Sequence, residues 1–256
     1  MTGSGFDHLL DGNIAVVTGA ARGNGEGIAR GLASAGAAVA ILDIDRGEAE
    51  AVAGKITADG GRAIACDIDV TSYAGCERAA VLVAENLGTP SILVNNAGVL
   101  IRARAADNDF LDSIRRQQDI NLVGPANMVK AFLPALTQTR GRVVNVGSTA
   151  CFRSPPAGSG YAASKGALLQ LTRVLAAELA PSGIRVNGIA PGLIATRMSA
   201  NLREDEETAA RILARTPLGR FGEPADLVGP VLFLVSEMSA YVTGVMLPVD
   251  GGQLTL

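Results

Sequence analysis

Seven short apolar segments, each separated from the next by a longer segment, constrain the fold of this chain most strongly. The short segments are rich in Val, Ile and Ala and cover residues 13–19, 37–44, 61–68, 91–98, 141–148, 184–191 and 244–250. Continuous apolar runs of this length are typical of strands that are buried on both faces of a sheet. The segments between them predict helices at 25–35, 46–59, 72–87, 107–137, 161–180 and 224–238.

This alternation of strands and helices predicts βαβ crossovers, and hence a parallel sheet with helices on both faces. No linker interrupts the pattern, so we expect one α/β domain with a doubly wound Rossmann fold over residues 1–256. Two irregular loops, 149–160 and 192–223, follow strand ends. Ligands bind beyond the carboxyl ends of the strands in such sheets, so we expect these loops to contact the substrate. The charged run 203–207 predicts a solvated helix face.

Composition excludes several functional classes. Of the 256 residues, 48% are hydrophobic and 18% are charged, which predicts a full hydrophobic core. The net charge of −3 argues against binding to nucleic acid or to a membrane surface, which would need a basic surface. The cysteines, Cys66, Cys76 and Cys151, and the single histidine, His8, argue against a zinc site or a Ser-His-Asp triad. Scattered cysteines, with no secretory signal and no bilayer-spanning run, predict a reduced, cytoplasmic protein.

A glycine-rich turn follows the first predicted strand. The sequence AVVTGAARGNGEG (residues 15–27) has glycines at 19, 23, 25 and 27. Glycine permits positive φ and close approach of backbone N–H groups to a ligand, and the next helix N-terminus adds unpaired donors. The turn therefore suits a diphosphate, although a tight turn without a ligand would explain a lone glycine cluster equally well. The spacing matches neither Gly-x-Gly-x-x-Gly nor a P-loop.

With Thr18 included, the turn reads Thr-Gly-x3-Gly-x-Gly, and it resembles that of the classical short-chain dehydrogenase/reductase family. Further motifs follow in the family's order, so the resemblance extends from Gly12 to Gly252. The family usually has a branched apolar residue where this chain has Asn24. The resemblance implies a seven-stranded sheet in the order 3-2-1-4-5-6-7 and a homotetramer or homodimer. Segment 244–250 would then pack across a two-fold axis, with a plain core strand as the alternative.

A carboxylate ends the second predicted strand and bears on the choice of cofactor. Asp43 lies about 20 residues beyond the turn, where a carboxylate can accept hydrogen bonds from adenosine ribose and would repel a 2′-phosphate. Arg22 argues the other way, because NADP-dependent relatives often carry a basic residue here that binds the phosphate, and Arg46 could assist. We predict that Asp43 decides and that NAD is preferred, with NADP as the alternative.

The resemblance also implies cofactor contacts after the later strands. Asp67 would contact adenine, the NNAG segment (95–98) would steady the sheet, and the segment from Pro191 would lie beside the nicotinamide. The full predicted set is Gly19, Arg22, Gly23, Asn24, Gly25, Asp43, Ile44, Asp67, Ile68, Asn95, Ala97, Gly98, Tyr161, Lys165, Pro191, Gly192, Ile194 and Thr196.

Tyr161 and Lys165, in the sequence YAASK, are four residues apart and share one helix face. A free phenol titrates near pH 10, so we expect the ammonium to lower the pKa of Tyr161 and make it an acid and base for an alcohol/carbonyl pair. Alone, the pair would be better explained as a surface pair on an amphipathic helix. Ser148, at a strand end, can bond a substrate oxygen. With Asn121 these residues match the family's catalytic tetrad, in which Lys165 would bind the nicotinamide ribose and Asn121 would hold a relay water.

Together the motifs predict an NAD(H)-dependent oxidoreductase that interconverts a secondary alcohol, such as a polyol or sugar alcohol, and its ketone without a catalytic metal. One alternative is an NADPH-dependent 3-oxoacyl-thioester reductase. Others are a same-fold enzyme that uses bound NAD for epimerisation or elimination, and a non-catalytic dinucleotide sensor or scaffold. Candidates for the substrate wall are Phe152, Leu193, Met198, Arg102, Arg104 and Arg153, although a solvated loop position is the commoner place for such arginines.

Overall fold

The computed structural model describes residues 8–153 and 158–256, and seven strands of these form one parallel sheet. Their order is β3-β2-β1-β4-β5-β6-β7, which confirms the expected Rossmann topology. Each strand lies within its predicted segment: β1 is Ile14–Thr18, β2 Ala38–Asp43, β3 Ala63–Asp67, β4 Ile92–Asn95, β5 Arg142–Val146, β6 Arg185–Pro191 and β7 Met246–Val249.

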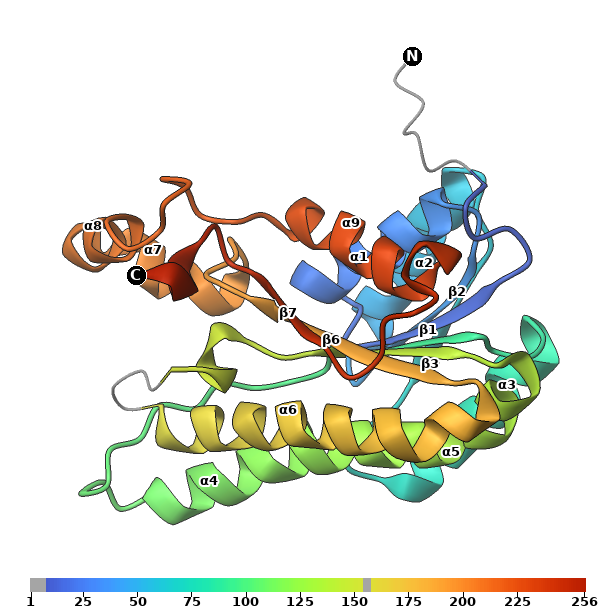
Figure 1. Cartoon of the computed structure of the whole chain (residues 1–256), viewed down its shortest axis with the longest axis horizontal. Coiled ribbons are helices and arrows are strands. Elements are labelled where there is room, and N and C mark those ends of the chain that lie inside the picture. The colour runs from blue at the N-terminus through green and yellow to red at the C-terminus, as the bar shows by residue number, and fades with distance from the viewer. Residues whose placement is uncertain (1–7, 154–157) are drawn as a thin grey trace.

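Helices cover both faces of the sheet (Figure 1). One face is covered by α1 (Gly23–Ser34), α2 (Arg46–Ala58) and α9 (Val228–Val235). The other face is covered by α3 (Tyr73–Asn86), α5 (Gly124–Thr139) and α6 (Ser159–Leu179), and α4 (Phe110–Gln118) packs against α6. Among these helices and the rest of the described chain, none is both long enough and apolar enough to cross a bilayer.

Two apolar clusters hold the layers together, one on each side of the sheet. Successive residues of β1 point to opposite faces, so Ala15 and Val17 belong to the cluster with α1 and α9, while Val16 belongs to the cluster with α3 and α5. All three side chains are fully buried. This explains why the strands read as continuous apolar runs, because both faces of the sheet are covered.

The segment predicted as one helix, 107–137, is divided in the structure. It contains α4, a π-helical turn at Asp119–Val123, and then α5. Pro125 stands at the start of α5 and has no N–H to donate to the carbonyl four residues earlier, so regular α-helical bonding is interrupted there. Such π-turns frequently occur at functional sites, and this one carries Asn121.

One of the two predicted loops is more ordered than its sequence indicates. The loop 192–223 contains α7 (Ala200–Glu204) and α8 (Glu206–Leu213), and Asp205 caps α8 by accepting a hydrogen bond from Thr208 N at 2.7 Å. Four residues of the charged run, 204–207, are exposed, as predicted for a solvated helix face. Of the loop 149–160, residues 154–157 with their paired prolines lie outside the described residues, as do residues 1–7 of the N-terminal segment.

Candidate active site

A cavity of about 1360 Å³ lies beyond the carboxyl ends of the strands. It is larger than most sites for drug-sized ligands, which supports a ligand as long as a dinucleotide. Most of the predicted site residues line it, although they come from loops spread over nearly 180 residues of sequence. The exceptions, which do not line the cavity, are Gly25, Asp67, Asn95 and Asn121.

The glycine turn forms one wall of this cavity. Gly19 and Gly23 have φ of 61° and 57°, values that L side chains rarely adopt. A Cβ atom at Gly25 would overlap the carbonyl oxygen of Gly19, so this position has no room for a side chain. Asn96 holds the turn in place, because its Nδ2 donates to the carbonyls of Thr18 and Gly19 at 2.9 and 2.8 Å. Gly25 therefore shapes the turn from behind the cavity surface.

The N-terminus of α1 opens into the cavity. Arg22 stands at the N-cap position, and its side chain makes no capping hydrogen bond. The first N–H groups of an α-helix have no partner within the helix, so this end presents free donors and a positive dipole end. Thr196 lies next to this end in the cavity wall, since a Cβ on Gly23 would approach the Thr196 Cγ2 to 3.3 Å. The free N–H groups and the threonine therefore line the same part of the cavity, where both could contact a diphosphate.

Asp43 lies at the end of β2, where its side chain is fixed by backbone groups. Its Oδ2 accepts from Ala21 N at 3.0 Å and its Oδ1 accepts from Asp45 N at 3.1 Å. Each carboxylate oxygen keeps a further lone pair for a ligand. The residue lines the cavity next to the glycine turn, the position in which a carboxylate can bind an adenosine ribose.

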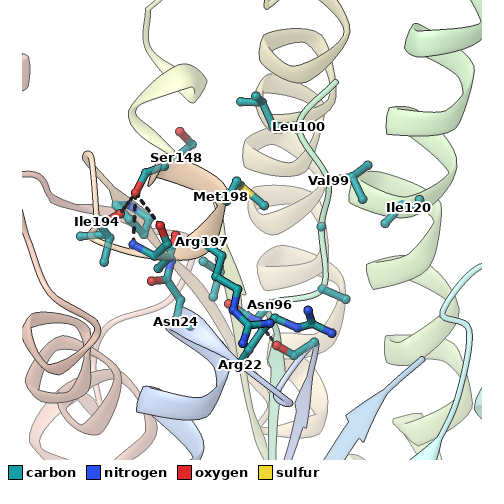
Figure 2. Close-up of a pocket in the computed structure, with 18 of the residues that line it drawn as sticks. Arg22, Asn24, Asn96, Val99, Leu100, Ile120, Ser148, Ile194, Arg197 and Met198 are labelled. Carbon is teal, nitrogen blue, oxygen red and sulfur yellow. Dashed lines mark hydrogen bonds between the residues drawn. The ribbon is translucent and has the colours of Figure 1, made fainter. Parts of the chain in front are cut away.

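Arg22 is held by two carboxylates that the sequence did not single out. It forms ion pairs with Asp45 (Nη2 to Oδ2, 2.8 Å) and with Glu48 (Nε to Oε2, 3.1 Å). Arg197, from the segment after β6, reaches the other oxygen of Glu48 at 3.3 Å, and Figure 2 shows Arg22 and Arg197 close together in the cavity. Arg46, expected to assist Arg22, instead pairs with Glu50 at 2.8 Å and does not line the cavity.

The adenine end of the cavity differs from the expected arrangement. Asp67, at the end of β3, is exposed and does not line the cavity, whereas Ile68 and Asp69 do. In the NNAG segment, Asn95 is buried and donates to Asn145 Oδ1 at 2.9 Å. Asn95 therefore steadies neighbouring strands from within the sheet, while Asn96 holds the glycine turn.

Lys165 and Tyr161 meet at the centre of the cavity. Lys165 is 4% exposed, and its Nζ donates to the carbonyl of Val146 at 2.7 Å. Burial lowers the pKa of Lys165 to about 8. The Nζ lies 5.9 Å from the centroid of the Tyr161 ring. The β5 carbonyl and the phenol ring thus fix the position of the ammonium.

The pKa of Tyr161 is raised above its ordinary value, which corrects the expectation that Lys165 lowers it. Burial of the phenol is the main cause, and the neighbouring Ser148 hydroxyl acts in the opposite direction. The ammonium does not reverse the shift; its Nζ lies 5.9 Å from the centroid of the ring and donates to Val146 O. Ser148 accepts a hydrogen bond from Ala150 N at 3.1 Å, so its Oγ is oriented at the end of β5.

Asn121, the fourth member of the predicted tetrad, lies behind the cavity surface. It is fully buried, and its side chain bonds the backbone of Val99 and the hydroxyl of Ser164. Gly98, which lines the cavity, lies against it, and a Cβ on this glycine would come 3.1 Å from Asn121 Oδ1 and 3.6 Å from Lys165 Nζ. Both amide hydrogens of Asn121 are used by protein partners, so its side chain serves to position the loop around Val99.

The substrate end of the cavity combines apolar and basic side chains. Of the six predicted candidates, Leu193, Met198, Arg102 and Arg153 line the cavity, whereas Phe152 and Arg104 do not. The apolar side chains of Val99, Leu100 and Ile120 also line the cavity, and Figure 2 shows them on the side away from Arg22 and Asn24. Throughout the described chain, no cluster of three or more His, Cys, Asp or Glu side chains could hold a metal ion.

The fold and this cavity define an oxidoreductase that uses a nicotinamide dinucleotide. Comparison with known proteins identifies its family. A family model described as enoyl-(acyl carrier protein) reductase matches residues 19–253. A galactitol 2-dehydrogenase (L-tagatose-forming) from Cereibacter sphaeroides is 41% identical over 249 residues, which cover 95% of each chain. The chain belongs to the short-chain dehydrogenase/reductase family of NAD(P)-dependent alcohol dehydrogenases and ketone reductases.

Two further relatives act on sugar acids. A 5-keto-D-gluconate 5-reductase from Escherichia coli (strain K12) is 37% identical over 252 residues, covering 96% of each chain. The crystal structure of a gluconate 5-dehydrogenase from Burkholderia cenocepacia J2315, in complex with NADP and tartrate, superposes with a TM-score of 0.92 at 35% identity. It covers 98% of this chain and 99% of that one.

Proposed function

We propose that this protein is an NAD(H)-dependent dehydrogenase that interconverts a secondary alcohol of a small polyhydroxylated substrate and its ketone. One observation carries the proposal: Tyr161, Lys165 and Ser148 line the same cavity as the glycine turn and the N-terminus of α1. A sensor or scaffold protein would need the turn but has no use for this group of side chains. The relatives that act on galactitol and on gluconates support a polyhydroxylated substrate.

The proposed cofactor would lie along the cavity with each end held by different segments. The free N–H groups at the start of α1, with Thr196, would bind the diphosphate, and Asp43 would accept from the adenosine ribose. Lys165 would bind the second ribose, beside Pro191 and its neighbours. When bound, the nicotinamide supplies the hydride acceptor or donor.

Tyr161 would move the proton of the reaction. Because its pKa is raised, the phenol is protonated at neutral pH and can donate to a carbonyl oxygen during reduction. In oxidation the deprotonated form takes the hydroxyl proton. The Ser148 hydroxyl, oriented by Ala150 N, would bond the substrate oxygen as its charge changes. Asn121 would support the loop that closes this part of the cavity.

The preference for NAD over NADP rests on the carboxylates near the ribose. Arg22, the residue that could bind a 2′-phosphate, is already paired with Asp45 and Glu48, and Asp43 lies in the same corner. A phosphate there would have to displace the carboxylates from Arg22, and it would be repelled by the negative charge of Asp43. The relative from Burkholderia cenocepacia binds NADP, so the choice has to be measured for this chain.

A rate screen tests the proposed function. Purified protein is assayed with NAD⁺ and NADP⁺ on galactitol, gluconate and simple secondary alcohols, and with NADH and NADPH on 3-oxoacyl thioesters. We expect turnover with a polyol or sugar acid and a higher kcat/KM with NAD⁺. Activity confined to NADPH and 3-oxoacyl thioesters would make the protein a thioester reductase instead. Binding of NADH without any turnover would favour the sensor alternative.

We further propose that the chain assembles as a homotetramer, with a homodimer as the alternative. The support is that β7 lies at the edge of the sheet, with one side unpaired by any described strand, and that Met238 and Tyr241 near it are exposed. A second copy packed along β7 would cover this region, as expected for exposed apolar patches. Sedimentation velocity should then give the mass of four chains, whereas a monomer mass at micromolar concentration would contradict the proposal.

A further inference from the structure

Five charged side chains lie close together around Asp43 in the cavity wall, and we name them the ribose-corner cluster. Its members are Arg22, Asp43, Asp45, Glu48 and Arg197. Four of them, all except Asp45, line the cavity, and Asp45 is joined to them by its bond to Arg22 and by its N–H to Asp43. Three carboxylates and two guanidinium groups leave the cluster with a formal charge of −1.

Glu48 is the link between the two arginines. Its Oε2 pairs with Arg22 Nε at 3.1 Å, and its Oε1 pairs with Arg197 Nη1 at 3.3 Å. The two arginines come from segments far apart in the sequence, one from the glycine turn and the other from the segment after β6. Glu48 therefore occupies both of the guanidinium groups that face this corner.

The neighbouring cations are also engaged. Lys55, further along α2 in the cavity wall, pairs with Glu26 at 3.0 Å, and Arg46 pairs with Glu50 at 2.8 Å. In the described structure, every basic side chain of α2 and of the glycine turn therefore already has a carboxylate partner. None of them is free to bind a phosphate group at this corner. Half-exposed ion pairs such as these contribute little to folding, so their arrangement bears mainly on what the corner can bind.

We propose that Glu48 is a specificity-determining residue, which excludes a 2′-phosphate from the ribose corner by binding Arg22 and Arg197 together. This inference rests on the proposed preference for NAD. It differs from the role of Asp43, because Asp43 receives the ribose whereas Glu48 withholds the cations that a phosphate needs. If Glu48 loses its charge, the formal charge of the cluster rises to zero, Arg197 loses its only carboxylate partner within the cluster, and Arg22 keeps only Asp45.

The test uses the full chain and two small probes that differ in one phosphate. Calorimetry measures the Kd of adenosine 2′,5′-bisphosphate and of adenosine 5′-monophosphate for the wild type and for Glu48→Gln. We expect the variant to shift the ratio of the two affinities toward the bisphosphate by about tenfold, since one repelling charge is lost and two guanidinium groups are released. The ratio of kcat/KM for NADPH to that for NADH should rise in the same direction.

Two further variants separate this mechanism from a general change of charge. Glu50→Gln removes the same charge from the same helix, but its partner Arg46 lies outside the cavity, so the affinity ratio should stay at the wild-type value. In the double variant Glu48→Gln/Arg197→Gln, the gain should be smaller than in Glu48→Gln alone, because the Arg197 guanidinium is then absent while Arg22 remains. Thermal unfolding confirms that each variant is folded. Glu48→Gln should keep the N-terminal cap of α2, because Asp45 Oδ1 accepts its hydrogen bond from the backbone N of residue 48 and not from the side chain.

The outcomes distinguish this inference from the proposed function. If the wild type prefers NADH but Glu48→Gln leaves the affinity ratio unchanged, Glu48 does not exclude the phosphate and the inference is wrong. An equal rise in Glu50→Gln would also overturn it, because bulk charge would then explain the effect. If the wild type itself binds the 2′,5′-bisphosphate more tightly and turns over faster with NADPH, the proposed cofactor preference fails, and the inference fails with it.

Discussion

Asn121 and Val99 form a reciprocal pair of hydrogen bonds: Asn121 Oδ1 accepts from Val99 N at 2.9 Å, and Asn121 Nδ2 donates to Val99 O at 3.0 Å. The amide also donates to Ser164 Oγ at 3.0 Å, on the helix that carries Tyr161 and Lys165. A single side chain in the π-helical turn therefore ties the loop after β4 to the catalytic helix. The carboxamide has the right donors and acceptor for both backbone groups.

Asn121→Ala should destabilise the protein by about 3 kcal/mol, because the part-buried N–H and C=O of Val99 and the buried Ser164 hydroxyl would lose their partner. Chemical denaturation followed by circular dichroism measures this change in the free energy of unfolding. Asn86→Ala is a matched control, since Asn86 is exposed at the end of α3 and donates only to Leu82 O. A loss below about 1 kcal/mol in Asn121→Ala would show that water replaces the amide.

Tyr161→Phe should lower kcat by about 10²–10⁴-fold, because the proton donor and acceptor is removed while the ring that contacts Lys165 remains. Fluorescence titration should show that NADH still binds. Tyr241→Phe is the control, because Tyr241 is fully exposed and lies outside the cavity. Turnover near the wild-type value in Tyr161→Phe would refute the assignment of Tyr161 as the acid and base.

Alcohol oxidation should become faster as the pH rises from about 7 to 9. Burial raises the pKa of Tyr161, so the deprotonated phenol that oxidation needs is a minor form at neutral pH and increases with pH. Ketone reduction needs the protonated phenol, which predominates throughout this range. Initial rates in both directions, measured at saturating cofactor, check this difference. A flat profile for oxidation would mean that proton transfer to Tyr161 does not limit the rate.

Lys165 should make stability depend on pH in a defined direction. Its folded pKa of about 8 lies below that of an unfolded lysine, so between pH 8 and 10 the unfolded chain holds more protons than the folded one. Stability therefore rises with pH across this window. The difference in unfolding free energy between wild type and Lys165→Met, both without cofactor, should increase by about 2 kcal/mol from pH 8 to 10. A constant difference would mean that Lys165 titrates alike in both states.

Gly25→Ala should abolish cofactor binding, because the new Cβ would overlap the Gly19 carbonyl and approach Ala20 Cα to 2.9 Å, which forces the turn to move. Calorimetric titration with NADH measures the loss of binding. Gly54→Ala is the control: Gly54 lies within α2 with no atom within 4 Å of its Cβ position, and alanine there should stabilise the helix by about 0.5–1 kcal/mol. Undiminished NADH binding in Gly25→Ala would show that the turn is not the diphosphate site.

Local properties of the chain could be predicted from the sequence because each depends on residues close together. Apolar runs predicted the seven strands, and the glycine cluster predicted a turn that permits positive φ, which Gly19 and Gly23 adopt. The four-residue spacing of Tyr161 and Lys165 predicted that both would lie on one helix face, and both line the cavity. The π-helical turn was missed, although the missing N–H of Pro125 is a local signal that could have placed it.

Only the tertiary structure decided how the charged and buried groups interact. Glu48 and Arg197 are 149 residues apart, and no local pattern indicates that crossovers around the sheet bring them to 3.3 Å. The sequence predicted that Lys165 would lower the pKa of Tyr161, but burial of the phenol raises this pKa instead. Sequence thus determined which residues form strands, turns and helix faces, since backbone conformation is a local property. Their electrostatics came from the fold, because burial and long-range distances are set only when the sheet and its helices pack.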